Sequence, residues 1–456
     1  MRTMNRRSFL QMATSSAALA AAGCFGGSTP APRAAKRPNI ILAMTDDQGW
    51  GDTGYNGHPV VETPALDAMA ETGLRFERFY SGAPVCSPTR GSCLTGRHPY
   101  RYGIFGANSG DGEDPSRYPL PPQEITLAEI LAAEGYATGH FGKWHLGDFS
   151  GPMRSSPADN GFQESFSTVR KVATLDPAGY FLNGEPYTDP LEGDDSAIIM
   201  DRALPFIRNA AANDQPFFTV IWFHSPHNPV IAAPEYRSRY AAHPEAQQHF
   251  WGTITAADAQ LGRLRDALRS LNVENDTMLW FCSDNGPAAN APFAAGTTKG
   301  LRGHKGNLYE GGVRVPGLLE WPSRVAQPRT IGMPCSTSDY LPTILDALNI
   351  AHPNARPLDG VSLLDTIDGA NRDRAHPIGF EHGDTATWVD DRYKLVARIE
   401  TDQPSSLELY DLLIDPNETA NLATSEAGLV AGNLEQLQAW RASCARSRSG
   451  SDYPVT

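Results

Sequence analysis

The sequence predicts an α/β fold in which helices flank a mostly parallel central sheet, followed by a smaller C-terminal α+β domain with an antiparallel sheet. From residue 39 onward, short apolar runs alternate with stretches of helical periodicity, as in α/β proteins. The runs at 217–223 and 277–282 are apolar apart from one threonine each, which is typical of strands buried on both faces. The chain beyond residue 360 is shorter and rich in strand patterns, which predicts the second sheet.

The elements follow in order from a first strand at residues 40–44. A helix is expected to start at Thr63 and Pro64 and to end at Gly73, because proline is tolerated in a first helical turn and glycine commonly follows the last. Other helices are expected at residues 125–133, 196–210, 254–271 and 341–348. Strands at 393–396 and 407–411 and a helix at 433–442 complete the chain. Pro353, Pro357 and Gly360 mark a loop, so we expect a catalytic domain at 39–350 and a smaller domain at 351–456.

The N-terminus has the pattern of a twin-arginine export signal, assigned to residues 1–23. Arg6 and Arg7 precede an apolar, small-residue run that is too short to span a membrane. Residues 24–38, rich in Gly, Ser, Thr, Pro and Ala, predict a flexible tether. The signal ends like a bacterial lipobox, so Cys24 is either an acylated N-terminus or a chance cysteine beside an ordinary cleavage site. We expect a periplasmic, cell-surface or secreted protein, which contacts a membrane only through a lipid on Cys24.

The net charge and the cysteine spacing exclude some classes of partner and site. The formal charge of -14 over 456 residues argues against nucleic acid as a partner, although a local cluster of cations could still bind an anionic ester. The spacings of the six cysteines match neither a zinc site nor a disulfide scaffold. Cys282 lies within an apolar run, which predicts a buried and inert thiol.

Polar residues follow the three expected core strands. Asp46 and Asp47 follow the first strand, the segment HSPH at 224–227 follows the second, and Asp284 and Asn285 follow the third. Ligands bind at the carboxyl ends of strands in open α/β sheets. The oxygen ligands suit a hard cation such as Ca²⁺ or Mg²⁺, although each pair by itself is an ordinary turn former.

The segment CSPTR at residues 86–90, continuing to LTGR at 94–97, carries the most specific pattern. Pro88 would sit in the first turn of a helix and place Cys86 at an N-terminus, where backbone N–H groups favour negative charge. By itself this predicts only a structural cysteine before a helix. Together, the residues resemble the signature of Cys-type sulfatases, of the alkaline-phosphatase-like superfamily. The resemblance implies an alkaline-phosphatase-like catalytic domain and a maturation enzyme that converts Cys86 to formylglycine.

Three further segments resemble elements of the same family. GKWHLG at 142–147 implies that Lys143 binds sulfate and that His145 contacts the formylglycine hydroxyls. HSPHNP at 224–229 assigns the active-site role to His227, with His224 as the alternative. The lysine loop, RGHKGNLYEGGVRVP at 302–316, implies that Lys305 lies near the sulfate. Within it, Glu310 and Arg314 are expected to be structural partners rather than catalysts.

The resemblance also implies a metal site and a mechanism. Ca²⁺ is the expected ion and Mg²⁺ the alternative, held by Asp46, Asp47, modified Cys86, Asp284 and Asn285. A hydrated formylglycine would attack sulfur, while Arg90, Lys143, Lys305 and the cation offset charge on the sulfate. Asp284 would deprotonate the attacking hydroxyl. His227, alone or with Lys305, would protonate the leaving alcohol, and His145 would take a proton from the second hydroxyl.

The expected substrate is a sulfated carbohydrate, on family grounds. Specificity is expected from loops at 107–122 and 169–190. Two alternatives stay open: a phosphonate or phosphate ester hydrolase of the same superfamily, and a non-catalytic surface protein that binds sulfated glycans. Because every expected catalytic side chain is present, a pure binding role is the weaker alternative.

Overall fold

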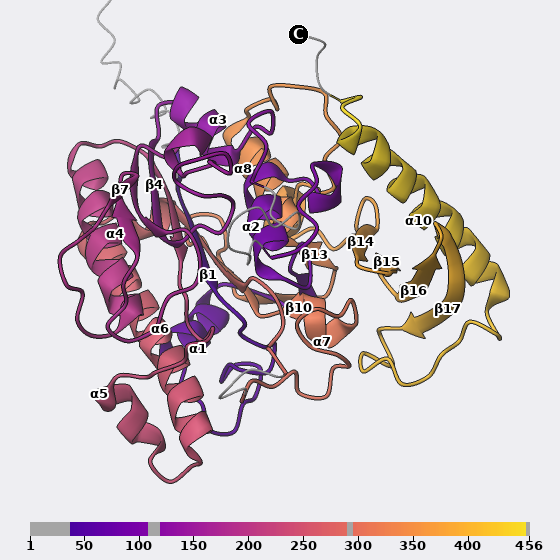
Figure 1. Ribbon diagram of the computed structural model, residues 1–456, viewed down its shortest axis with the longest axis horizontal. Coiled ribbons are helices and arrows are strands. Elements are labelled where there is room, and N and C mark those ends of the chain that lie inside the picture. The colour runs from indigo at the N-terminus through magenta and orange to yellow at the C-terminus, as the bar shows by residue number, and fades with distance from the viewer. Residues whose placement is uncertain (1–36, 108–118, 290–294, 453–456) are drawn as a thin grey trace, which may run out of the picture. The chain divides into compact units, whose positions relative to one another are not determined.

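A sheet of ten strands forms the centre of the protein, seen in a computed structural model that describes residues 37–107, 119–289 and 295–452 (Figure 1). The expected signal, Cys24 and the tether up to residue 36 lie outside the described residues. The order of the strands is β12 (Arg329–Ile331), β2 (Leu74–Phe76), β11 (Gly317–Glu320), β9 (Thr277–Ser283), β1 (Asn39–Thr45), β8 (Phe217–Trp222), β4 (Ala137–Lys143), β5 (Glu164–Thr168), β6 (Tyr180–Leu182) and β7 (Glu185–Pro186).

The inner strands β9, β1, β8, β4 and β5 run parallel to one another, whereas β11 pairs antiparallel with β9, and β6 and β7 form an antiparallel hairpin beside β5. All seven residues of β1 are buried. Burial on both faces explains the unbroken apolar runs, because helices cover each side of a parallel sheet.

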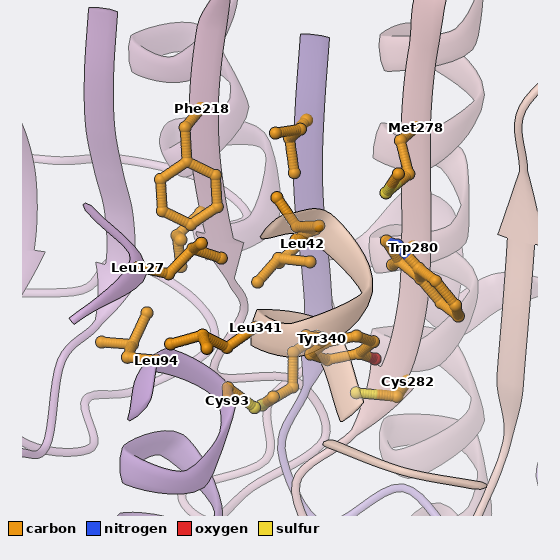
Figure 2. Packing of buried hydrophobic residues seen from close by; sticks show 14 of the residues in the cluster. Leu42, Cys93, Leu94, Leu127, Phe218, Met278, Trp280, Cys282, Tyr340 and Leu341 are labelled. Atoms are coloured by element: carbon orange, nitrogen blue, oxygen red, sulfur yellow. The ribbon is translucent and has the colours of Figure 1, made fainter. Parts of the chain in front are cut away.

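Alternate residues of β1 belong to two different hydrophobic cores. Ile40, Leu42 and Met44 face a core that includes Leu94, Leu127 and Leu341 from helices on that side. Figure 2 shows Leu42, Leu94, Leu127 and Leu341 converging in this layer. Ile41 and Ala43 face the opposite core, together with residues of α1, α4 and α6. The central sheet is therefore sandwiched between two helical layers.

The helices have these bounds: α1 Pro64–Thr72, α2 Cys86–Thr95, α3 Leu127–Ala133, α4 Asp195–Ala212, α5 Pro234–Arg237, α6 Glu245–Ser270, α7 Glu310–Val313, α8 Tyr340–Leu348, α9 Leu364–Ile367 and α10 Ala427–Arg448. Short 3-10 helices are η1 Pro99–Arg101, η2 Ala158–Asn160, η3 Ser238–Tyr240, η4 Glu274–Asp276 and η5 Thr337–Asp339. Within the described ranges, no helix is both long and apolar enough to cross a membrane.

Two smaller sheets complete the fold. The first has three strands in the order β10 (Arg314–Val315), β3 (Phe79–Tyr80) and β13 (Cys335–Ser336). The second is antiparallel, with β14 (Ile378–His382), β15 (Thr385–Val389), β16 (Tyr393–Glu400) and β17 (Gln403–Asp411), and α10 packs against it (Figure 1). The predicted fold class is thus confirmed.

The expected helices and strands are present, with shifted ends. The helix expected at 254–271 begins earlier, at Glu245, and the one expected at 433–442 extends to Ala427–Arg448. A single core contains Tyr80 and Val313 together with Phe380 and Val396 of the antiparallel sheet. The boundary expected at residue 350 stays a prediction.

Candidate active site

The carboxyl ends of β1, β8 and β9 are held together by backbone hydrogen bonds. The amide of Asp46 donates to the carbonyl oxygen of Ser225 at 3.0 Å, and the amide of Asp284 donates to that of Thr45 at 3.1 Å. Asp46, Asp284 and Asn285 are fully buried. The three polar strand ends predicted from the sequence therefore meet at one place in the fold.

Cys86 is the first residue of α2, and Pro88 lies in the first turn, as the sequence predicts. Its side chain belongs to the same cluster: one ligand atom each from Asp46, Asp47, Cys86 and His227 lie within 4.8 Å of one another. Burial raises the pKa of the Cys86 thiol to about 12, although Lys143 and Lys305 act in the opposite direction. An unmodified Cys86 is therefore a neutral thiol at neutral pH.

Asp47 adopts a left-handed backbone conformation with φ 64°. One of its carboxylate oxygens, Oδ1, accepts hydrogen bonds from Asn285 Nδ2 at 2.7 Å and from Lys305 Nζ at 2.5 Å. Its backbone amide donates to Asp284 Oδ1 at 3.2 Å. A non-glycine residue in this region is strained, and the ties to Asp284, Asn285 and Lys305 hold it there.

Arg90 and Lys143 bring two buried cations to the acidic cluster. Arg90 donates to Asp284 Oδ2 at 2.7 Å and lies 3.4 Å from Asp46 Oδ2. Lys143 Nζ is 2.5 Å from the same Asp46 oxygen. Burial acts to raise the pKa of Asp46, but Lys143, His227 and Arg90 outweigh it and hold the pKa well below its usual range. Burial and the charge of Asp46 raise the pKa of Asp284 to about 7, against the pull of Arg90.

His145 is positioned by the turn that follows β4. Gly142 has φ 103°, and a Cβ there would lie 2.0 Å from the carbonyl oxygen of Trp222, so only glycine fits. The amide of His145 donates to the carbonyl oxygen of Val169 at 3.1 Å. Burial first, and then Lys143 and Arg90, lower the pKa of His145 well below its ordinary value. Its imidazole is thus neutral and able to accept a proton.

The structure separates the two histidines after β8. His227 Nε2 lies 3.7 Å from Asp47 Oδ2, while its Nδ1 is 2.7 Å from the carbonyl oxygen of Asn228, to which it donates. Burial lowers the pKa of His227 to about 4, although Asp46 and Asp47 oppose this. His224 is buried away from the acidic cluster between Asp195 Oδ2 and Thr168 Oγ1, each at 2.8 Å. His227, and not His224, is therefore the histidine that lies at the acidic cluster.

The lysine loop is tied by its backbone to the segments around Pro287 and Pro84. The amide of Lys305 donates to the carbonyl oxygen of Pro287, and that of Gly306 donates to Pro84, two residues before Cys86. Burial acts to lower the pKa of Lys305, but Cys86 and Asp47 outweigh it, so the pKa lies well above its ordinary value. Glu310 is buried and paired with Lys394, as expected of a structural residue.

The oxygen atoms of the acidic cluster suit a hard divalent cation as ligands. Among the described residues, none donates a hydrogen bond to Asp46 Oδ1 or to Asn285 Oδ1, and both atoms are buried. Buried oxygen acceptors normally have a partner, and a cation would supply one. The acidic residues Asp46, Asp47 and Asp284 add the negative charge that such an ion requires.

Further residues orient the site without touching its centre, and no sequence motif marks them. The amide of Gln48 donates to Ser283 Oγ, and Thr45 Oγ1 donates to Gln48 Oε1, which fixes the turn that carries Asp47. Asp195, which holds His224, also went unnoticed because it reads as an ordinary helix-starting residue. The position of Gln48, directly after Asp46 and Asp47, was the only available signal.

Comparisons with known proteins address the identity of this site. Residues 38–350 match the Sulfatase family, and residues 303–440 match the family described as N-sulphoglucosamine sulphohydrolase, C-terminal. Human arylsulfatase A is 31% identical over 90% of this chain and 88% of its own length. N-acetylgalactosamine-6-sulfatase of the dog is 32% identical over 80% of this chain and 72% of its own.

A solved structure shares the fold. That of Ps i-CgsB in complex with k-i-k-neocarrahexaose superposes with a TM-score of 0.79 and 24% identity, over 89% of this chain and 93% of that one. The signature around Cys86, the acidic strand ends and the matches over most of the chain agree, so this protein belongs to the sulfatase family and is a sulfuric ester hydrolase.

Proposed function

We propose that this chain hydrolyses sulfate esters of carbohydrates, with a nucleophile made from Cys86 by oxidation to formylglycine and with one divalent cation, Ca²⁺ rather than Mg²⁺. The observation that carries the proposal is the convergence of Asp46, Asp47, Cys86 and His227 ligand atoms within 4.8 Å, next to three cationic side chains. A sulfate ester is a single anion whose oxygens can be shared between those cations and a metal ion.

The buried thiol supports a modified nucleophile. Because the pKa of Cys86 is about 12, an unmodified thiolate would be scarce at neutral pH. Formylglycine supplies a hydrated aldehyde, of which one hydroxyl attacks sulfur and the other allows sulfate to be expelled afterwards. The cation, held by Asp46, Asp47, Asp284 and Asn285, supplies Lewis-acid stabilisation of the sulfate oxygens.

The chain's own cations bind and orient the ester. Arg90 and Lys143 are fully buried and therefore rigid, while Lys305 keeps 19% of its side chain exposed at the open side. Donors fixed in place before the reaction stabilise developing charge without reorganisation. Arg90 also lies 5.1 Å from the Trp222 ring, which packs against its guanidinium.

Proton transfer is divided between groups of different pKa. We assign the proton of the attacking hydroxyl to Asp284, whose carboxylate lies in the acidic cluster, and neutral His145 can take that of the second hydroxyl. His227 is neutral at rest because its pKa is about 4, whereas Lys305 retains its proton. We therefore propose that Lys305 holds the proton for the leaving alcohol, and that this proton passes to it directly or through the unprotonated Nε2 of His227.

Sulfated carbohydrate is supported as the substrate class by the names of similar proteins. One relative is named for an amino-sugar sulfate, and one structural neighbour was solved with a carrahexaose. The segment at 169–190 starts at the carboxyl end of β5, beside His145, where it can contact the alcohol part of the ester. Residues 108–118 of the other expected specificity loop lie outside the described ranges.

A paired assay tests the activity. Nitrophenyl sulfate and nitrophenyl phosphate are compared as substrates of protein purified from its natural host. We expect sulfate turnover to dominate and to be lost in Cys86→Ala, whereas Cys86→Ser becomes sulfated once at most. Cys444→Ala is the matched control, because Cys444 lies on α10 and should leave turnover unchanged. A preference for phosphate would favour the phosphonate or phosphate ester alternative, and multiple turnovers by either Cys86 variant would exclude the proposed nucleophile.

We also propose export by the twin-arginine route, on the sequence alone, to the periplasm, the cell surface or the medium. Replacing Arg6 and Arg7 with Lys should retain the protein in the cytoplasm, as fractionation would show. Release of the exported protein without detergent would argue against a lipid on Cys24.

A further inference from the structure

Lys394 is a lysine of the C-terminal sheet whose side chain is completely buried. It lies on β16 and forms ion pairs with Glu310 Oε1 and Glu418 Oε1, each at 3.0 Å. Neither side chain of these pairs is exposed. Burying a charge is costly, so a completely buried lysine demands that its partners be held in fixed positions.

Glu310 makes further polar contacts with buried neighbours. Its Oε2 accepts a hydrogen bond from the Tyr80 hydroxyl at 3.0 Å and lies 3.6 Å from the Arg314 guanidinium. Its backbone amide donates to Glu418 Oε2 at 2.7 Å. The two carboxylates thus face two cations, Lys394 and Arg314, and removal of Lys394 would leave an uncompensated buried negative charge.

Glu310 is also the point at which the catalytic lysine loop enters α7. Five residues earlier lies Lys305, whose Nζ is 2.5 Å from Asp47 Oδ1. The cluster around Lys394 therefore fixes the C-terminal end of the segment that carries Lys305.

Arg302 fixes the N-terminal end of the same segment against the same sheet. Its guanidinium carbon lies 3.7 Å from the centre of the Tyr309 ring, and its NH1 donates to the Tyr410 hydroxyl at 2.7 Å. It also lies 3.1 Å from Glu408 Oε2 on β17. Both ends of residues 302–310 are thus anchored on the antiparallel sheet, and Lys305 lies between the anchors.

We propose that Lys394 is a positioning residue for Lys305: its buried ammonium group, with Arg302 at the other anchor, holds residues 302–310 so that Lys305 reaches the sulfate. Lys394 touches neither the acidic cluster nor Cys86 in the contacts of the described residues, and acts through Glu310 and the loop. The inference rests on the sulfate-binding role proposed above for Lys305. It makes the antiparallel sheet part of the machinery that sets the reaction rate.

A double-mutant cycle tests the coupling. We expect Lys394→Met to lower kcat/KM for nitrophenyl sulfate by about tenfold to a hundredfold, as displaced supporting groups typically do. The inhibition constant of inorganic sulfate should rise with it. In a Lys305→Ala background, Lys394→Met should change either constant by less than about twofold, because the group that it positions is already missing.

Two further variants keep the test decisive. Arg392→Met removes a cation that precedes β16 and is half exposed in an ion pair with Asp411, so it should leave kcat/KM unchanged. If Lys394→Met does not fold, Arg302→Met replaces it in the cycle, since Arg302 is 40% exposed and anchors the other end of the segment. Thermal melting of each variant shows that the assays are made on folded protein.

The outcomes separate this inference from the proposed function. If Lys305→Ala alone leaves kcat/KM and sulfate inhibition unchanged, the role proposed for Lys305 fails, and the inference fails with it. If Lys305→Ala is impaired but the effects of the two substitutions multiply, the role of Lys305 stands and Lys394 has only a general structural part. Overlapping effects support the inference.

Discussion

At the scale of single residues, Asp47 and His145 shape the site through left-handed backbone conformations, with φ 64° and 60°. The motif around Cys86 and the acidic strand ends named residues that do converge. The left-handed backbone of Asp47 and His145 gave no sequence signal, because it is held by hydrogen bonds to Asp284 and Val169, which follow other strands of the sheet. The hydrogen bond from Asn285 Nδ2 to Asp47 was not predictable either, because the two residues lie 238 positions apart in the chain.

A first prediction concerns Asn285 as a ligand of the proposed cation. Its Oδ1 is buried and accepts no hydrogen bond from the part of the chain that is described, so a cation is its expected partner. We expect Asn285→Ala to raise the Ca²⁺ concentration needed for half-maximal activity by at least about tenfold. Enzyme stripped with a chelator and titrated with Ca²⁺ measures this. Asn213→Ala, at the exposed end of α4, should behave like the parent, and an unchanged titration of Asn285→Ala would remove it from the site.

At the scale of elements, the order of helices and strands was predictable and some of their ends were not. Periodicity placed the start of α6 near residue 254, but the helix begins at Glu245. Gly252 lowers the helical signal there, and it is needed because a Cβ would lie 2.6 Å from that of Ala232. Packing against the segment before α5 therefore outweighs propensity, which a sequence pattern cannot show.

Gly142, near the end of β4, allows a prediction about the strand end that carries Lys143 and leads to His145. Gly142→Ala should lower the free energy of unfolding by about 2 to 5 kcal/mol, because it combines a positive φ with overlap on the Trp222 carbonyl oxygen. It should also lower kcat/KM by displacing the two side chains. Gly135→Ala is the matched control: φ is also positive, but a Cβ there meets open space, so the cost should be only about 1 kcal/mol with normal activity. Urea unfolding and steady-state assays compare them, and equal effects of the two substitutions would refute the argument.

At the scale of the whole molecule, the arrangement of layers was predictable but the links between them were not. Strand alternation and apolar runs are enough to predict a parallel sheet between helical layers. The buried ion pair of Lys394 with Glu310 joins residues 84 positions apart and requires knowing which surfaces meet. The link between η1 and α10 through Asp359, which binds both Arg101 and Trp440, is of the same kind.

His98, whose amide donates to Asp359, should make the free energy of unfolding depend on pH. Burial lowers its pKa to about 3 in the folded protein, whereas an unfolded chain has a value near 6.5. The unfolded state therefore binds the proton first, so stability is fully present above pH 6.5 and is lost as the pH falls toward 3. Between pH 7 and pH 5 the loss from this residue should be about 2 kcal/mol.

Replacement of His98 tests this dependence. His98→Asn keeps an acceptor for the amide of Tyr100 but cannot be protonated, so its stability should fall less between pH 7 and pH 5 than that of the parent. His376→Asn alters an exposed histidine and should retain the parent's slope. Denaturant unfolding at several pH values measures the slopes, and equal slopes for His98→Asn and the parent would contradict the assignment.

The central claim is that the nucleophile is made from Cys86, and the mass of the peptide that contains it tests this most directly. Protein purified from its natural host is cleaved after Arg90, which separates Cys86 from the buried Cys93. The masses of the two peptides are then measured. We predict that Cys86 has lost sulfur and two hydrogens and gained one oxygen, while Cys93 remains a thiol. An intact thiol at Cys86 in a fully active preparation would contradict the account.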